Sequence, residues 1–192
     1  MDFIDRVFTQ ARTHYAWTPE PVSDEELRQL HELWRWPPTG GNAQPLRVAF
    51  VRSAEAKERL RPTLAPLNVE KAMTAPVTAI LAYDVAWYDQ LPRLAPSLPG
   101  NRERILGLPV AERERLATLN ALLQAGYFIL AARTIGLDCG PMGGFDREKL
   151  DAAFFPDGAW RSLFVCNLGH GDPARTFPRQ PRLEFADACR IV

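Results

Sequence analysis

The sequence predicts an α+β fold in a single domain over residues 1–192. Segments with helical periodicity and apolar, β-branched runs are mixed along the chain. They do not alternate as βαβ units, which argues against a doubly wound parallel sheet. The hydrophobic share of 46% and the charged share of 24% are ordinary for a globular protein. A chain of this length can bury a sizeable core.

Two helices are predicted near the N-terminal end. Residues 2–13 place apolar side chains on one side of a helix. A second helix begins after Ser23, because Ser23 and Glu26 have the spacing of a capping box. Pro37 and Pro38 end it, since proline lacks the amide proton that a helix interior needs.

Two strands with a short helix between them come next. LRVAFVRS, residues 46–53, has the length and composition of a strand, and AEAKERLRPTL, residues 54–64, predicts a short helix. APVTAILAYD, residues 75–84, is an apolar run with β-branched residues, so a more deeply buried strand is expected there.

The middle of the chain changes character twice. Residues 87–113 mix proline, glycine and charge with weak periodicity, and predict a mobile excursion with one short helix, a candidate lid. Residues 116–135 are apolar nearly all round, which is typical of a buried central helix. Gly136 is a natural residue to end that helix, and a glycine-rich loop follows over 136–146.

The last part of the chain adds one helix, one strand and an arm. Residues 146–155 predict a short helix capped by Asp146, and SLFVCNLGHGD, residues 162–172, predicts a third strand. Residues 176–192 form a proline-rich arm that carries arginines.

Composition excludes several classes of function. The net charge is zero and the pI is near 6.8, so no overall basic field indicates nucleic acid or an anionic membrane. No tract approaches the roughly 20 apolar residues that span a bilayer, and the charged N-terminal residues lack a secretory signal. Three widely spaced cysteines without a CxxC pair predict free thiols in a reducing cytoplasm. The three histidines are far apart, so no metal site is expected.

Four separated segments have the residue types that bind a flat, anionic ligand. They are ARTHYAW, WPPTGGNAQP, LNVEK, and GPMGGFD together with the late arginines. Arginine binds phosphate through a fixed fork of donors, and glycine lets a ligand approach the backbone closely. Each segment alone has an ordinary interpretation, because an Arg-Thr pair is common and Gly-Gly in a loop is often only a turn.

Taken together, the motifs are much more specific than any one of them. ARTHxxW, VSDExLRxLxxLxxWxPT, RPxLxxxNxxKxxxAPVTAIxAxD, QAxYxIxAxRxxGLDxGPMxGFD and NxGxGDP run nearly end to end. In these motifs the chain resembles the FMN-dependent nitroreductase family, and within it the malonic semialdehyde reductases of uracil degradation.

The resemblance implies a set of residues around the FMN phosphate. In relatives, a basic and hydroxyl-bearing segment near the N-terminal end holds the phosphate and ribityl chain, and a late basic residue closes on the phosphate. The matching residues here are Arg12, Thr13, His14, Arg182 and, less closely, Arg179.

The resemblance also implies contacts along the flavin ring. The loop that lies along the flavin is matched by Thr39, Gly40 and Asn42, and the pair at the pyrimidine end of the ring by Asn68 and Lys71. A cation there would stabilise the negative charge of the reduced ring.

The glycine-rich loop completes the implied site. Its residues Pro141, Met142, Gly143 and Gly144 are counted as cofactor-binding, with the last two presenting backbone amides near N5 and O4 of the ring. The implied architecture is a nitroreductase-like fold with a central mixed β-sheet flanked by helices. Its implied assembly is an intertwined homodimer with FMN at the interface.

The implied activity is a ping-pong hydride transfer without a catalytic side chain. NADH or NADPH would act as a transient reducing substrate, because a GxGxxG fingerprint is absent from the sequence. The acceptor would be a small aldehyde such as malonic semialdehyde, a nitroaromatic, a quinone or an enone. Two alternatives stay open: a flavin store or sensor without nicotinamide turnover, and a flavin-dependent oxidase or tailoring enzyme.

Overall fold

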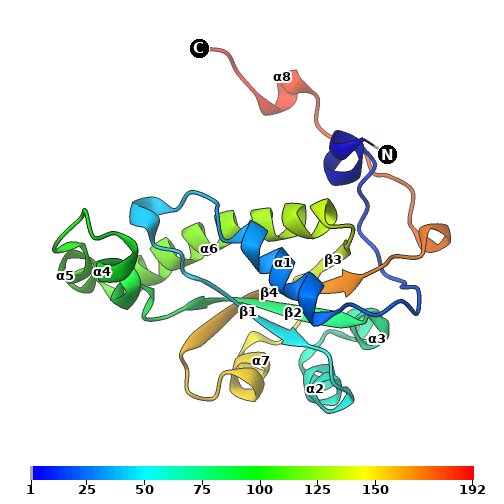
Figure 1. Ribbon diagram of the computed structural model, residues 1–192, viewed down its shortest axis with the longest axis horizontal. Helices are drawn as coiled ribbons and strands as arrows, with labels where there is room; N and C mark the ends of the chain where they lie inside the picture. The colour runs from blue at the N-terminus through cyan, green and yellow to red at the C-terminus, as the bar shows by residue number, and fades with distance from the viewer. Residues whose placement is uncertain (1) are drawn as a thin grey trace.

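The computed structural model describes residues 2–192, with helices on both faces of a central sheet (Figure 1). The strands lie in the order β1-β2-β4-β3, and each neighbouring pair is antiparallel. Their bounds are Leu46–Val51 for β1, Val77–Asp84 for β2, Asp138–Met142 for β3 and Trp160–Gly169 for β4. The α+β prediction is therefore confirmed.

The sheet differs from the prediction in two ways. The segment predicted as a glycine-rich loop contains β3, which Gly140 and Pro141 concealed because both residues are disfavoured in strands. An edge position accommodates the proline, since one side of an edge strand needs no ladder hydrogen bond. The predicted mixed sheet is wrong for this chain: within residues 2–192, parallel pairing is limited to one bridge between Thr13 and Cys139.

Strand β2 is buried on both faces. Val77, Ala79 and Leu81 join the hydrophobic cluster on one side, and Ile80 and Ala82 join the cluster on the other. This is the period-two alternation of a strand covered by helices on both sides. The prediction of a more buried second strand is confirmed.

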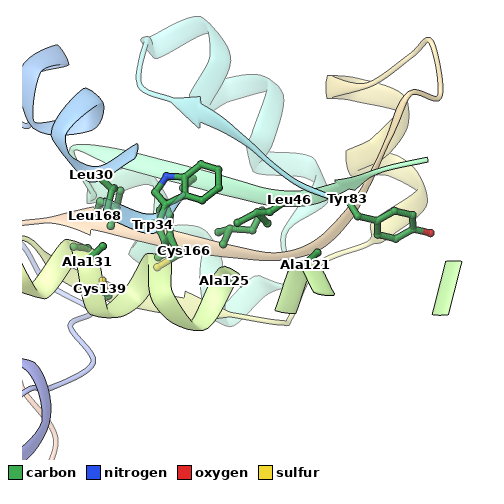
Figure 2. Packing of buried hydrophobic residues seen from close by; sticks show 14 of the residues in the cluster. Leu30, Trp34, Leu46, Tyr83, Ala121, Ala125, Ala131, Cys139, Cys166 and Leu168 are labelled. Carbon is green, nitrogen blue, oxygen red and sulfur yellow. The ribbon is translucent and has the colours of Figure 1, made fainter. Parts of the chain in front are cut away.

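One face of the sheet is covered by α1 (Asp24–Trp34) and α6 (Val110–Thr134). Figure 2 shows their side chains meeting those of the strands, and includes the two buried free thiols Cys139 and Cys166. The predicted capping box at the start of α1 is present, with the Ser23 hydroxyl accepting from the Glu26 amide.

Helix α6 begins six residues before its predicted start. It ends at Thr134, and Gly136 follows with a φ of 92°, as a helix-terminating glycine does. The prediction that this helix is buried all round is only half right within this chain. Leu119, Leu122, Leu123 and Tyr127 on its outer side are 45–52% exposed.

The opposite face is covered by α2 (Ala54–Leu60), α3 (Pro66–Thr74) and α7 (Arg147–Phe154). These helices surround the second hydrophobic cluster, below the sheet in Figure 1. Helix α3 was not predicted, because its apolar periodicity is weak. Pro66 in its first turn is a typical start residue, since a proline there leaves no helical hydrogen bond unmade.

The predicted excursion at 87–113 is more helical than expected. It contains η4 (Trp87–Gln90), α4 (Leu91–Leu94), α5 (Asn101–Leu106) and the start of α6. Trp87, Leu91 and Ile105 are buried in the core, which fixes these short helices to the domain.

The N-terminal segment and the C-terminal arm lie side by side (Figure 1). The predicted helix at 2–13 is reduced to a short π-helix, η1 (Asp5–Thr9), because the residues after it pair with β3 instead. There the His14 amide donates to the Cys139 carbonyl at 3.0 Å. Just before the arm lies η5 (Pro173–Arg175), and the arm itself carries only α8 (Phe185–Ala188).

Gly140→Ala should destabilise the protein, because a Cβ at residue 140 would lie 2.5 Å from the His14 carbonyl oxygen. That carbonyl belongs to the segment paired with β3 and cannot retreat freely. We expect a loss of about 1–3 kcal/mol in the free energy of unfolding, measured by urea denaturation. Gly107→Ala is the control, since its Cβ would meet its nearest neighbour at an ordinary 3.5 Å. Equal stability of the two variants would contradict the prediction.

Candidate functional site

A cavity of about 400 Å³ lies between the N-terminal segment and the C-terminal arm. Its lining includes Arg12, Arg133, Arg179 and Arg182, and no carboxylate. Across residues 2–192, none of these arginines takes part in an ion pair. Guanidinium groups that converge without a counter-ion form a binding site suited to phosphate.

Backbone carbonyls hold the arginines of this cavity. The Arg12 guanidinium donates to the carbonyl of Phe177, and Arg179 Nη2 donates to the carbonyl of Ala11 at 3.0 Å. These reciprocal bonds join the arm to the N-terminal segment. Arg182 Nη1 donates at 3.0 Å to two carbonyls of its own arm. Each guanidinium has five donors, so each keeps donors for a ligand.

Arg133 is a member of the cavity to which the sequence analysis assigned no role, although it stands in the motif QAxYxIxAxRxxGLDxGPMxGFD. It lies in the last turn of α6, where an arginine is usually explained by the negative end of the helix dipole. Its Nη1 donates to the carbonyl of Val7 at 3.0 Å. Its Nε is buried and, within residues 2–192, has no hydrogen-bond partner. A buried donor without an acceptor is costly, and a bound anion would satisfy it.

Asn68, Lys71 and Gly144 adjoin this cavity through Tyr15, which lines it. Lys71 Nζ lies 4.8 Å from the centroid of the Tyr15 ring and 3.3 Å from Asn68 Oδ1. Asn68 Nδ2 in turn donates to the Gly144 carbonyl at 2.9 Å. The Tyr15 ring packs edge-on to Phe177, with 5.4 Å between centroids. Tyr15 is thus a second site residue to which the sequence analysis assigned no role.

The two glycines predicted to approach the flavin differ in their surroundings. Gly143 is exposed, and a Cβ there would meet nothing within 4 Å. At Gly144 a Cβ would lie 2.6 Å from Asn68 Nδ2, so a side chain would displace the asparagine. Of the two residues before them on β3, Pro141 is half-buried and Met142 is buried.

Thr13 and His14 point in different directions. Thr13 lines the arginine cavity, whereas His14 lines a neighbouring cavity of about 500 Å³. The His14 ring is buried against Gly171, and its Nε2 lies 3.5 Å from Asp138 Oδ1. Arg12, Arg133 and Arg179 line both cavities, so Thr13 and His14 each lie beside the arginines, and His14 has Asp138 as a further partner.

The predicted loop residues Thr39, Gly40 and Asn42 lie far from the arginine cavity. The Gly40 amide donates to Asn120 Oδ1 on α6 at 2.7 Å. Asn120 and Arg133 are 13 residues apart on that helix, which corresponds to about 20 Å along its axis. Figure 1 likewise shows this loop at the end of α6 away from the N-terminal segment and the arm. The predicted site is therefore divided into two half-sites within one chain.

The loop is held in an unfavourable backbone conformation. Gly41, Asn42 and Gln44 have φ values of 60°, 53° and 43°. Left-handed non-glycine residues persist only where their surroundings impose them, and they cluster at functional sites. Two hydrogen bonds help to hold this conformation. Asn42 Nδ2 donates to the Leu94 carbonyl at 2.6 Å, and the Gln44 amide donates to Thr39 Oγ1 at 3.3 Å.

A third cavity, of about 630 Å³, separates this loop from the helices of the excursion. Apolar side chains dominate its lining, and Gly40 and Asn120 border it. Polar groups come from Asn101, Arg104 and Glu112. A small, mostly apolar molecule with one or two polar groups matches such a lining.

Comparisons with known proteins identify the family of this chain. The model of the nitroreductase family matches residues 9–170. A protein of Leptothrix cholodnii, named as a candidate NADH dehydrogenase/NAD(P)H nitroreductase, is 54% identical over 189 residues, covering 98% of this chain and 95% of the relative. The chain therefore belongs to the nitroreductase family, and the prediction of an oxidoreductase is confirmed at that level.

Solved structures share the fold at low sequence identity. A candidate nitroreductase of Exiguobacterium sibiricum, solved in complex with FMN, superposes with a TM-score of 0.87 at 23% identity, covering 100% of this chain and 98% of that one. A candidate NAD(P)H:FMN oxidoreductase of Staphylococcus epidermidis superposes with a TM-score of 0.86 at 20% identity, covering 100% of this chain and 96% of that one.

No helix in residues 2–192 has both the length and the apolar character to cross a bilayer.

Asn120→Ala should release the loop, because it removes the acceptor of the Gly40 amide. We expect a stability loss of about 1–2 kcal/mol and faster hydrogen exchange at Gly40. Gln124→Ala is a matched control one turn along α6, since Gln124 Oε1 accepts from the Leu46 amide at 3.0 Å instead. It should lose comparable stability and leave exchange at Gly40 unchanged. Unaltered Gly40 exchange in the Asn120 variant would refute this role.

Proposed function

We propose that this chain binds FMN and acts as an NAD(P)H oxidoreductase, as a homodimer with FMN at the subunit interface. The observation that carries the proposal is the cavity of four unpaired arginines, continued by Tyr15 and Lys71. It offers a phosphate site beside an aromatic ring and an ammonium that has no carboxylate partner in residues 2–192, which are groups suited to FMN. The names of the relatives and the FMN bound to a structural neighbour support the same ligand.

The homodimer is supported by two features of the single chain. The loop around Gly40 and the arginine cavity are half-sites near opposite ends of α6, and a second copy would supply the missing half to each. The outer face of α6 also exposes large apolar side chains, and so does the arm. Exposed apolar surface of this kind marks an interaction site. The members on α6 are Leu119, Leu122, Leu123 and Tyr127.

In this proposal the side chains bind and orient, and none acts as an acid or base. When bound, FMN supplies hydride transfer between NAD(P)H and a second substrate. Arg12, Arg133 and the arm arginines would hold the phosphate. Lys71, whose ammonium has no carboxylate partner in residues 2–192, would stabilise negative charge at the pyrimidine end of the ring. The antiparallel sheet has no Rossmann crossover, which fits a nicotinamide that binds only transiently.

We further propose a small acceptor, such as malonic semialdehyde, a nitroaromatic or a quinone. The support is the cavity between the Gly40 loop and the excursion, which has room for a small molecule. Its Arg104 is bonded to Asn101 Oδ1 and has no carboxylate partner within the described residues, so it could hold a polar group of the acceptor.

The purified protein should be yellow, or should become yellow with added FMN, and should bleach rapidly under anaerobic NADH or NADPH. The measurement is a visible absorption spectrum before and after the nicotinamide is added. Yellow protein that does not bleach would favour the store, sensor or oxidase alternatives. Protein that takes up no FMN would overturn the proposed function.

Mixed dimers should reveal the shared site. Arg12→Glu disrupts one half-site and Gly40→Trp the other, so neither homodimer should bind FMN. Co-expressed chains should form mixed dimers in which one site is intact and the other carries both changes. We expect those dimers to recover about half of the wild-type FMN content. The shared site would be contradicted if the mixed dimers contained no more FMN than the two variant homodimers, or if either variant homodimer had the wild-type FMN content.

A further inference from the structure

Lys57 is a buried lysine without a carboxylate partner in residues 2–192. It lies on α2 with 5% of its surface exposed. Its Nζ donates to the Ala72 carbonyl at 2.6 Å, the Ala75 carbonyl at 3.0 Å and the Thr78 hydroxyl at 2.8 Å. An ammonium has three protons, so all of them are used. Lysine is almost never this buried unless it is paired with a carboxylate, so the burial of Lys57 among neutral acceptors needs an explanation.

The carbonyl acceptors lie at the C-terminal end of α3. Ala72 is in its last turn and Ala75 follows its last residue, Thr74. The last carbonyls of a helix lack helical donors and form the negative end of its dipole. Lys57 therefore caps α3 from a neighbouring helix, with a charge of the favourable sign.

The network continues from Lys57 to the backbone of Lys71. Thr78 Oγ1 donates to Asn167 Oδ1 at 2.7 Å, and Asn167 Nδ2 donates to the Lys71 carbonyl at 3.0 Å. Thr78 and Asn167 are register partners on β2 and β4. Three carbonyls of this end of α3 are thus fixed to the sheet and to α2 by buried side chains.

The residues that α3 presents to the proposed site depend on this anchoring. Asn68 and Lys71 lie on α3 itself, and Asn68 connects it to Gly144 on the loop after β3. A rotation of α3 would displace the Lys71 ammonium and break the contact with Gly144. Burial lowers the pKa of Lys57 from its ordinary 10.5 to about 8, so the ammonium still predominates at neutral pH.

We propose that Lys57 is a positioning residue: its buried ammonium holds α3 so that Lys71 and Asn68 stay in place for FMN. The inference rests on the proposed function, because it concerns the same site. Lys57 does not line the arginine cavity, and it acts only through α3.

Lys57→Met tests this role, because methionine keeps an unbranched side chain and removes the charge and the donors. The apoprotein should bind FMN at least about tenfold more weakly in a fluorescence titration, a difference of about 1.4 kcal/mol. Amides in the last turn of α3 should exchange about tenfold faster in the apoprotein. The midpoint potential of bound FMN should fall, since the Lys71 charge is less well placed.

The control is Lys149→Met, which removes an exposed lysine of α7 and should leave all three values unchanged. A double-mutant cycle with Lys71→Met separates positioning from general weakening. Because part of the effect of Lys57 passes through Lys71, adding Lys57→Met to Lys71→Met should weaken FMN binding by a clearly smaller factor than Lys57→Met does alone. Fully additive losses would overturn the proposal.

Thr78→Val provides a second variant in case Lys57→Met does not fold. It removes one acceptor of Lys57 and the donor to Asn167, and should shift the same values in the same direction by a smaller factor. If the variants that fold keep wild-type FMN affinity and wild-type amide exchange in α3, the role of Lys57 is overturned and the proposed function is not affected. Failure of the wild-type protein to bind FMN would instead overturn the proposed function, and this inference with it.

Discussion

The burial of β2 on both faces is the constraint on which the rest of the structure depends. Its alternating side chains supply two hydrophobic clusters, so helices must cover both sides of the sheet. Helices α1 and α6 satisfy one face, and α2, α3 and α7 satisfy the other. This arrangement leaves β3 at an edge, where the N-terminal segment joins it through the bridge between Thr13 and Cys139. Thr13, one partner of that bridge, also lines the arginine cavity.

Charge in the molecule is distributed unevenly although the net charge is zero. Within residues 2–192, four surface arginines are paired with carboxylates three residues away, as Arg61 is with Glu58 and Arg115 with Glu112. Such pairs contribute little to stability and leave no cation available. The arginines of the cavity are held by carbonyls instead, which orient a guanidinium without neutralising it. What sets the cavity arginines apart is that four of them line one cavity whose lining contains no carboxylate.

Local patterns in the sequence predicted the parts of the fold that depend on local interactions. The capping box at Ser23, the buried alternation of β2 and the glycine that ends α6 were all visible in a few residues. Strand β3 was concealed, because its stability comes from pairing with β4 and not from its own residues. Helix α3 was missed for a similar reason, since distant side chains cap it.

Residues of the candidate site could be predicted only where they belong to a motif with a known role in the family. Resemblance identified Arg12, Lys71 and Asn68, and the structure brings them near one another. Arg133 stands in one of the matching motifs, but the resemblance gave it no role, because its contacts depend on the position of α6 relative to the N-terminal segment. Nor could the resemblance show that the Gly40 loop lies near the opposite end of α6, because spacing along the chain carries no information about which half-site a residue serves.

The bonds between the N-terminal segment and the arm also affect the order of events during synthesis. Arg12 and Phe177 are separated by 165 positions, and Ala11 and Arg179 by 168. Closing a loop of that length is slow and costs entropy, so the sheet and its helices would be expected to form first. The arm must therefore leave the ribosome and reach the folded body before the cavity between the arm and the N-terminal segment can exist. The sheet and its helices would fold first into a body that lacks this cavity, and the cavity would form only when the arm closes on it.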